Sequence, residues 1–352
     1  MTEPPPLSDA PVFLLGSHKS GTSLLRALLD GHPELTVLPR ETHFFPNSGH
    51  AVMYGLKRQP PTDDADVIRR RFADHVAARA RGAAAKPGDA FSDAPDFAGY
   101  DAERFEREFA YQSSEPTRRQ FERYAHALHA AATGEPLSEG ARIVEKSVEN
   151  AEFADLLAAM FPAARFVHIV RNPYATLVAI RRSRVRAGGR FPELASIVDA
   201  IASSFVFLDR NVRRLGEAHL VIRYEDLLAQ PEASMRRVAE HLRIAFTPTL
   251  LQPTSKGAAW AGNSTSGDGF AGISAAPLSG WQSDLLPFEV QVVAARLDWV
   301  LDRFGYERVP PTRGRLRGGL LRVLGLDGAP RESVGTFLRN RALQHQDWPG
   351  AK

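Results

Sequence analysis

The sequence predicts an α/β fold in which helices cover both faces of a central, mainly parallel sheet of about five strands. Short apolar segments typical of buried strands recur along the chain and alternate with helical segments. The first of these strands runs directly into a glycine-containing loop and then into a helix. Because apolar strands that alternate with helices are typical of a parallel sheet buried on both faces, we expect three layers.

The first predicted elements are a strand at residues 11–16, the loop "GSHKSGTS" at residues 16–23 and a helix at residues 22–30. Leucines form a stripe along this helix, and Gly31 stands where a helix-terminating glycine belongs. Gly16 and Gly21 let backbone amides turn inward, and the start of the helix adds its positive end. The segment predicts a P-loop-NTPase-like architecture with an anion-binding loop; the alternative is a tight turn without a ligand.

A second short strand is predicted at residues 35–38. Residues 47–140 are polar, rich in Arg and Ala, and carry helical patterns at residues 66–81 and 101–132. We interpret this region as a helical insertion on the core. After it, the pattern predicts strands at residues 142–145, 165–170 and 219–224, and helices at residues 151–161, from 172 onward, 194–215 and 288–304.

We expect one domain at residues 11–308, with a flexible N-terminus at residues 1–10 and a basic tail at residues 309–352. Residues 257–280 are rich in Gly and Ser, which predicts a functional loop. The run "RGRLRGGLLR" at residues 313–322 would suit weak peripheral contact with an anionic membrane, but its Gly-Gly break favours a solvated tail.

The composition of the 352 residues is ordinary for a globular protein, with 43% hydrophobic and 24% charged residues. The absence of cysteine excludes disulfides, thiolate metal sites and a cysteine nucleophile.

No apolar stretch is long enough for a membrane span, and the start of the chain does not read as a signal peptide, so we expect a cytoplasmic protein without integral membrane association. The net charge of +3 is spread along the chain without aromatic interleaving, which gives no signal for nucleic-acid binding. Nothing indicates an oligomeric state.

The cations in two segments suggest the kind of anion that is bound. Only six basic residues are lysine, and two of them, Lys19 and Lys146, lie in segments of chemical interest. Lys19 precedes Gly21, whereas the lysine of an ATP-binding loop follows the second glycine. Arg171 ends a predicted strand where a nucleoside triphosphatase carries an aspartate for Mg²⁺. An arginine cannot hold Mg²⁺ but can hold another phosphate, which favours a nucleotide with an additional phosphate group.

These segments resemble the sulfotransferases that use 3′-phosphoadenosine 5′-phosphosulfate (PAPS). The similarity is carried by "KSGTSLLRALLDGHPEL", "EKS", "FVHIVRNP", "RYEDLLAQPEASMRRVAEHL" and "FAGISAAPLSGWQSDLLP". These segments are spread over most of the chain outside residues 47–140, the insertion that we expect to lie on the acceptor side of the core. The resemblance implies a P-loop-like sulfotransferase fold, PAPS as co-substrate, adenosine 3′,5′-bisphosphate (PAP) as product, and no metal.

The resemblance also implies which residues bind the donor. The residues expected to cradle the 5′-phosphosulfate are His18, Lys19, Ser20, Gly21, Thr22 and Ser23. Arg171 would bind the 3′-phosphate, and the segment that contains Gly272 and Ile273 is similar to the family's late loop over that phosphate. The family usually has a serine eight residues after this arginine, where the chain has Ala179. Ser183 or Thr176, each on the same helix, could take its place.

Sulfuryl transfer requires a base for the acceptor proton and cations where negative charge develops. Glu41 in "RETHFF" resembles the catalytic glutamate of family members that act on glycans; the alternative is a loop glutamate paired with Arg40. His43 is a second candidate base, since an extended segment would place it on the same face as Glu41. Lys146 resembles a lysine that assists the transferring sulfonate. His168 is expected to be structural.

The sequence therefore predicts a PAPS-dependent sulfotransferase that acts on a hydroxyl or amine of a small-molecule, glycan or lipid acceptor. Two alternatives remain open. The first alternative is a phosphotransferase or kinase, which would use Mg²⁺ and ATP. The position of Lys19 and the absence of a strand-end aspartate count against this alternative. A non-catalytic nucleotide-binding protein on the same fold is supported by Ala179 alone.

Overall fold

The computed structural model describes residues 4–39, 41–80, 100–260, 262, 272–310, 323 and 332–343. Its central sheet has five parallel strands in the order β2-β3-β1-β4-β5. They are β1 (Val12–Gly16), β2 (Thr36–Val37), β3 (Ile143–Lys146), β4 (Arg165–Val170) and β5 (His219–Arg223). The predicted α/β class with a parallel sheet of five strands is confirmed. A separate pair of short antiparallel strands, β6 (Thr254–Ser255) and β7 (Ala258–Ala259), lies outside this sheet.

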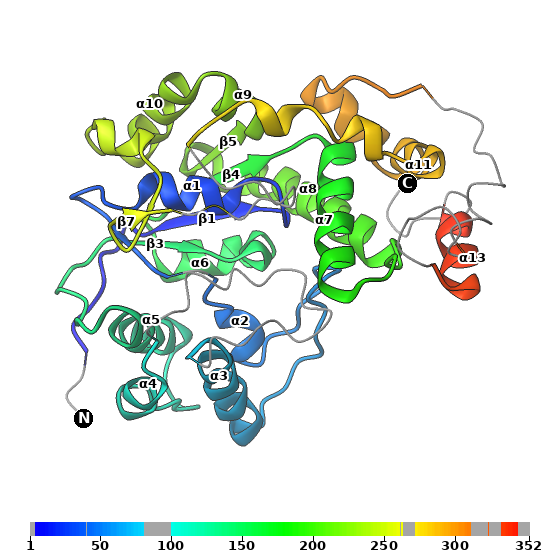
Figure 1. Ribbon diagram of the computed structural model, residues 1–352. Helices are drawn as coiled ribbons and strands as arrows, with labels where there is room; N and C mark the ends of the chain where they lie inside the picture. The colour runs from blue at the N-terminus through cyan, green and yellow to red at the C-terminus, as the bar shows by residue number, and fades with distance from the viewer. Residues whose placement is uncertain are drawn as a thin grey trace.

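Helices lie on both faces of the sheet (Figure 1). The elements near the start of the chain are α1 (Thr22–Leu29), α2 (Phe44–Asn47), α3 (Ala65–Ala80), α4 (Ala102–Glu108), α5 (Thr117–Thr133) and α6 (Ala154–Met160). They are followed by α7 (Pro173–Gly188), α8 (Ala195–Leu215), α9 (Tyr224–Ala229), α10 (Pro231–Leu242), α11 (Pro287–Phe304) and α13 (Val334–Ala342). Helices α1, α9 and α10 share an apolar cluster on one face, and α5 and α6 share another on the opposite face.

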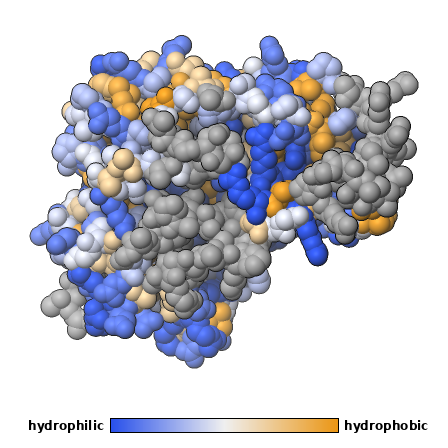
Figure 2. Space-filling view, viewed as in Figure 1, coloured by the Kyte–Doolittle hydropathy of each residue, from blue (hydrophilic) through white to orange (hydrophobic). Residues whose placement is uncertain are grey.

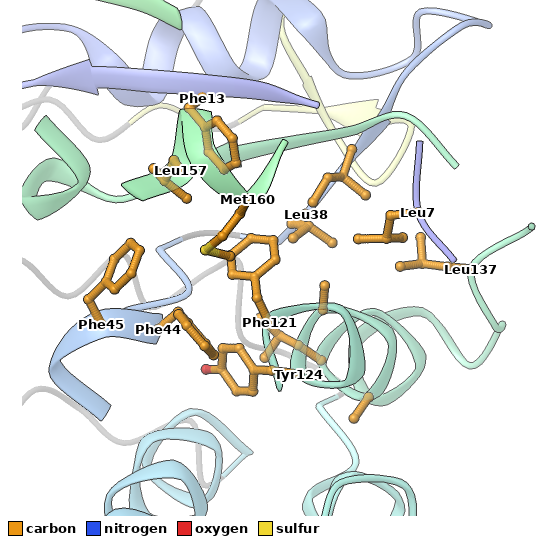
Figure 3. Packing of buried hydrophobic residues seen from close by; sticks show 14 of the residues in the cluster. Leu7, Phe13, Leu38, Phe44, Phe45, Phe121, Tyr124, Leu137, Leu157 and Met160 are labelled. Atoms are coloured by element: carbon orange, nitrogen blue, oxygen red, sulfur yellow. The ribbon is translucent and has the colours of Figure 1, made fainter. Parts of the chain in front are cut away.

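Strand β1 contributes to both of these apolar clusters because successive side chains of a strand point to opposite faces. Val12 and Leu14 pack with α1 and α10, while Phe13 and Leu15 pack with α5 and α6. The Phe13 ring lies 6.2 Å from the Phe121 ring of α5, and Figure 3 shows both rings within the same apolar layer. The central strand is therefore fully enclosed, which fixes the position of the loop that follows it.

The structure divides one predicted helical region in two and contradicts one predicted strand end. The pattern at residues 101–132 forms two helices, because the chain breaks after Glu108 and α5 starts only after Pro116. Tyr224 does not end β5 but begins α9, where its ring packs beneath the first glycine-containing loop. Some positions named in the sequence analysis lie outside the described residues. They are Arg40, the part of the Gly/Ser-rich segment at residues 263–271, which contains Phe270, and residues 311–322 of the tail.

Helix α13 belongs to the described part of the tail and packs against the main body. The buried Asn340 side chain accepts from the backbone N–H of Leu194 at 2.8 Å and donates to the Pro192 carbonyl at 3.0 Å. The domain boundaries at residues 10 and 308 stay predictions.

Figure 2 shows polar residues over much of one face of the molecule, with apolar residues in separate patches. Of the helices in the described ranges, none combines the length and the apolar character that crossing a membrane requires.

The loop between β1 and α1 depends on two glycines with unusual backbone angles. Gly16 has φ 150° and Gly21 has φ 105°. A Cβ atom on Gly21 would lie 2.3 Å from Cδ2 of Tyr224, and one on Gly16 would lie 2.7 Å from the Ile169 carbonyl oxygen. Larger residues are excluded at both positions, so the loop backbone lies directly against β4 and α9.

We predict that Gly21→Ala lowers the free energy of unfolding by about 3 kcal/mol, because backbone strain adds to the overlap with Tyr224. Gly134→Ala is the matched control: Gly134 also has positive φ, at 81°, but a Cβ atom there would have nothing within 4 Å. The control should cost about 1 kcal/mol. Urea denaturation measures both, and equal losses would show that the contact with Tyr224 does not constrain the loop.

A buried histidine, His168, and a half-buried one, His219, lie on adjacent strands and predict acid sensitivity. The His168 and His219 rings lie 5.8 Å apart. Burial and then His219 hold the pKa of His168 well below its usual value, and burial lowers the pKa of His219 to about 4. Between about pH 6.5 and pH 4 the unfolded chain binds more protons, so stability falls as pH falls. We expect His168→Gln to flatten this dependence in urea titrations; an unchanged slope would contradict it.

Candidate active site

The carboxyl ends of β1 and β4 are joined by Arg171. Its Nη1 donates to the Lys19 carbonyl at 2.8 Å, and its guanidinium lies 4.7 Å from the centre of the Tyr224 ring. Lys19 has a left-handed backbone with φ 61°. The predicted anion loop and the predicted strand-end cation therefore form one continuous surface, because parallel strands end at the same edge of the sheet.

The residues after Arg171 begin α7 as their types suggest. The Asn172 side chain accepts from the backbone N–H of Tyr174 at 2.9 Å, and Pro173 occupies the first turn. Asn172 donates its own backbone N–H to Glu225 at 2.9 Å, which ties α7 to α9. Arg171 is thus held at the junction of a strand and two helices.

The positions considered for a second 3′-phosphate ligand differ in their surroundings. Ala179 and Ser183 are both buried in α7. The Thr176 hydroxyl donates to the Asn172 carbonyl at 3.0 Å, a bond within the helix. Ser183 lies one turn beyond Ala179, about 6 Å further along the axis and away from Arg171. The structure thus brings neither hydroxyl into contact with Arg171, and the role of Ser183 stays a prediction.

The late segment approaches Arg171 through a different residue from the two that were predicted. Arg171 Nη2 donates to the Pro277 carbonyl at 3.3 Å. Ile273 is half-buried and packs against the apolar cluster that contains Tyr224. Arg182 of α7 fixes the following residues, since it donates to the Gly280 carbonyl at 2.9 Å and pairs with Asp284 at 2.6 Å.

A cluster of charged side chains lies beside the loop and includes three predicted residues. Lys146 Nζ at the end of β3 donates to Glu41 Oε1 at 2.9 Å, and His43 Nε2 lies 3.1 Å from Glu41 Oε2. Two further members were not predicted. Lys57 Nζ lies 2.5 Å from Glu41 Oε2, and the fully buried Glu149 places Oε1 2.6 Å from His43 Nδ1. Glu41 is thus surrounded by cations.

Opposite charges keep the cluster ionised despite its burial. Burial opposes ionisation of Glu41, but Lys146 and Lys57 outweigh it and hold the pKa of Glu41 well below its usual value. Burial is likewise outweighed at Glu149 by Lys57 and His43, which lower its pKa to about 2. The pKa of Lys57 is raised, because Glu149 and Glu41 overcome the effect of burial.

Glu145 holds the segment that carries Glu41 and His43. This fully buried carboxylate accepts from the hydroxyls of Thr42 at 2.8 Å and Ser147 at 2.6 Å. Burial raises the pKa of Glu145 to about 7. The Ser147 hydroxyl accepts from the backbone N–H of His43 at 3.2 Å, and Tyr124 donates to the Thr42 carbonyl at 2.7 Å. The segment is therefore tied to the end of β3 and to α5.

The side chains of Glu41 and His43 meet, although the backbone between them is not extended as expected. His43 has φ 50° and immediately precedes α2. Phe44 and Phe45 then point into the apolar core, as Figure 3 shows, and anchor the start of that helix. The left-handed turn at His43 lets one short segment present two polar groups to the site and two aromatic rings to the core.

His18 links the anion loop to the segment that carries Lys57. The Tyr54 hydroxyl accepts from the His18 backbone N–H at 3.1 Å and lies 3.0 Å from the ring Nδ1. Burial, followed by the nearby Lys57, lowers the pKa of His18 well below its usual value, so its ring is neutral. Glu152 holds the same segment by accepting from the backbone N–H groups of Met53 and Tyr54. Contact between His18 and the phosphosulfate stays a prediction.

One group of residues in the described ranges has the geometry of a cation site. Ligand atoms of Glu41, His43 and Glu149 lie within 4.8 Å of one another. Lys57 Nζ contacts all three residues, at 2.5 Å from Glu41, 3.0 Å from His43 Nδ1 and 3.3 Å from Glu149. The cation that this group holds is an ammonium, so a metal ion would have to displace Lys57.

The sequence offered weak signals for the residues that were missed. Lys57 is one of six lysines in an arginine-rich chain, and Glu149 follows the "EKS" segment by two positions. Neither lies in a recognisable motif. Lys57 reaches Glu41 because residues 52–57 fold back over the loop after β1, and Glu149 reaches His43 from the turn that follows β3.

The comparisons with known proteins agree with the fold. A model of the sulfotransferase family matches residues 11–248, more than half of the chain. The chain is 28% identical over 178 residues to omega-hydroxy-beta-dihydromenaquinone-9 sulfotransferase Stf3 of Mycobacterium bovis and of Mycobacterium tuberculosis. That match covers 46% of this chain and 40% of those proteins, so the chain spans less than half the length of these curated relatives.

Two solved structures share the architecture. The sulfotransferase domain from the curacin biosynthetic pathway has a TM-score of 0.54 at 18% identity, covering 86% of this chain and 100% of that domain. The sulfotransferase domain from the Synechococcus PCC 7002 olefin synthase has a TM-score of 0.51 at 21% identity, covering 88% and 99%. These likenesses show the fold, and the family match extends over the loop, Arg171 and the charged cluster: the chain belongs to the sulfotransferase family.

Proposed function

We propose that the protein transfers the sulfuryl group of PAPS to a hydroxyl or amine of an acceptor and releases PAP. The observation that carries this proposal is the bond from Arg171 to the Lys19 carbonyl, which unites the two elements that we expect to bind anions, at adjacent strand ends. One element suits the 5′-phosphosulfate and the other suits the 3′-phosphate. A nucleotide with phosphates at both positions matches this pair.

Residues of the loop would bind the donor without a metal. Lys19, Ser20, Thr22 and the start of α1 surround the 5′-phosphosulfate in this proposal, and Arg171 holds the 3′-phosphate. Lys19 neutralises charge on the oxygen between sulfur and phosphorus as that bond breaks. Pro277 and its neighbours lie beside Arg171 and would help to enclose the phosphate.

The transfer itself is an in-line displacement. The acceptor oxygen or nitrogen forms a bond to sulfur while the bond from sulfur to the bridging oxygen breaks, and the electron pair of that bond remains on PAP. Glu41 receives the acceptor proton. Lys146, which contacts Glu41 at 2.9 Å, would stabilise the sulfonate oxygens as they transfer.

The acceptor class follows from a weaker observation. The matched mycobacterial relative is named for a hydroxylated menaquinone derivative, which supports a hydroxyl on a lipid-like molecule here. Glycan and small-molecule acceptors remain alternatives that a screen would resolve.

We predict that PAP raises the melting temperature, whereas Mg-ATP at the same concentration does not. At a PAP concentration 100 times its Kd, the added stability is about 2.7 kcal/mol. Arg171→Ala should abolish most of the shift. Arg236→Ala is the control, since Arg236 is exposed and pairs with Glu232 within α10. A shift with Mg-ATP instead would favour a phosphotransferase and overturn the donor assignment.

We also predict that Glu41→Gln retains the PAP-induced shift but lowers kcat by about 10²- to 10⁴-fold, because the amide cannot take the acceptor proton. Transfer from radiolabelled PAPS to molecules in a cell extract provides the measurement and identifies the acceptor. An active Glu41→Gln variant would assign the base to another group. Binding of PAP without transfer to any molecule by the unmodified protein would favour the non-catalytic alternative.

A further inference from the structure

Two arginines of the α7 region reach the same short segment of the chain. Arg171 precedes the helix, and its Nη2 donates to the Pro277 carbonyl at 3.3 Å. Arg182 lies further along the helix, and its Nη2 donates to the Gly280 carbonyl at 2.9 Å. Three residues of chain span at most about 11 Å, so both guanidinium groups face one small region beside the end of β4.

The direction of side chains on a helix favours an approach of Arg182 to Arg171. Helical side chains tilt towards the N-terminus of their helix, so a long side chain covers the surface of the preceding turn. For Arg182 the preceding turn contains Ala179, which comes three residues earlier on the same face. Ala179 offers only a methyl group to a ligand there, whereas the guanidinium of Arg182 has five N–H donors.

Electrostatics show that the charges of the two arginines act on each other. Burial lowers the pKa of Arg171, and the positive charge of Arg182 lowers it as well. Tyr224, Glu225 and Tyr306 act in the opposite direction without reversing the result. Because two like charges repel, an anion between them would stabilise both.

The two arginines are only partly compensated by negative charge. Arg171 bonds to two neutral acceptors, the carbonyl oxygens of Lys19 and Pro277. Arg182 pairs with Asp284 at 2.6 Å, but the side chain of Asp284 is 44% exposed, so solvent weakens this ion pair. Among the bonds of the described residues, the two guanidinium groups therefore share a single carboxylate.

We propose that Arg182 is a second binding residue for the 3′-phosphate of the donor, so that Arg171 and Arg182 hold one phosphate together. Phosphate oxygens replace the Gly280 carbonyl and the Asp284 carboxylate as acceptors of Arg182. Bonds from an arginine to phosphate are stronger than bonds to a neutral carbonyl, because both partners are charged. The inference rests on the proposed use of PAPS and specifies which side chains recognise its 3′-phosphate.

The test compares two ligands that differ only in the phosphate concerned. PAP carries the 3′-phosphate, and adenosine 5′-monophosphate (AMP) lacks it. Ligand-observed NMR titrations of the full-length protein, which extend to weak binding, give Kd for each. The unmodified protein should prefer PAP, and Arg182→Ala should weaken PAP binding by about 10- to 100-fold with little change for AMP. Arg182→Lys keeps the charge without the planar fork and should lose less.

Asp284→Asn separates phosphate binding from anchoring of residues 280–284. This variant breaks the ion pair that ties the segment to α7 but leaves Arg182 in place. If Arg182 binds phosphate, loss of the competing carboxylate should leave the affinity for PAP unchanged or raise it. If Arg182 only anchors the segment, Asp284→Asn should weaken PAP binding as Arg182→Ala does, and that result would refute the proposal.

Arg236→Ala is the matched control for loss of an arginine that pairs with a carboxylate. Arg236 is exposed, bonds to Glu232 within α10 and should not affect either Kd. Equal losses of PAP and AMP affinity in Arg182→Ala, or an unchanged affinity for PAP, would overturn the role of Arg182. Failure of the unmodified protein to bind PAP would instead refute the use of PAPS, so the two proposals fail by different results.

Discussion

The hydrogen bond from Arg171 to the Lys19 carbonyl joins the carboxyl ends of two adjacent parallel strands, and the site is built around it. It requires a loop that lies directly against β4, which only glycine at positions 16 and 21 permits. It also requires Arg171 to be fixed, and Asn172, Tyr224 and the start of α7 provide that. Enclosure of β1 between two apolar layers keeps both ends of the bond in place.

Charge compensation is the second constraint on the site. Burying a carboxylate is costly unless cations and hydrogen bonds accompany it. Glu41 and Glu149 share Lys57, and Glu145, whose pKa is raised to about 7, is stabilised by hydroxyl and amide donors instead. Neighbouring carboxylates thus differ in their readiness to ionise because of their partners, and the site obtains its cations from side chains.

The elements near the loop between β1 and α1 could be predicted because each is specified by residue types within a short stretch of sequence. The apolar run of β1, Gly21 before α1, and Asn172-Pro173 before α7 each specify a strand, a loop or a helix start within a few residues. The signal failed where local preference was overridden by packing. The apolar segment at residues 219–224 predicted a strand that ends at Tyr224. In the structure Tyr224 instead begins α9, and its ring fills the space beneath Gly21 and Arg171.

The sequence by itself determined the α/β class and the strand–loop–helix at the start of the chain, and it offered Glu41, His43 and Lys146 as candidates, since each rests on residue types at short spacing. Only the tertiary structure decided that Lys57 and Glu149 join them. Residues 52–57 are brought over the loop by contacts of Tyr54 with His18 and of their backbone with Glu152. Glu149 contacts Lys57 and His43 across 92 and 106 positions, and Lys57 contacts Glu41 across 16. Contacts of this kind leave no periodic trace in a sequence, so the partners of the proposed base were fixed by folding.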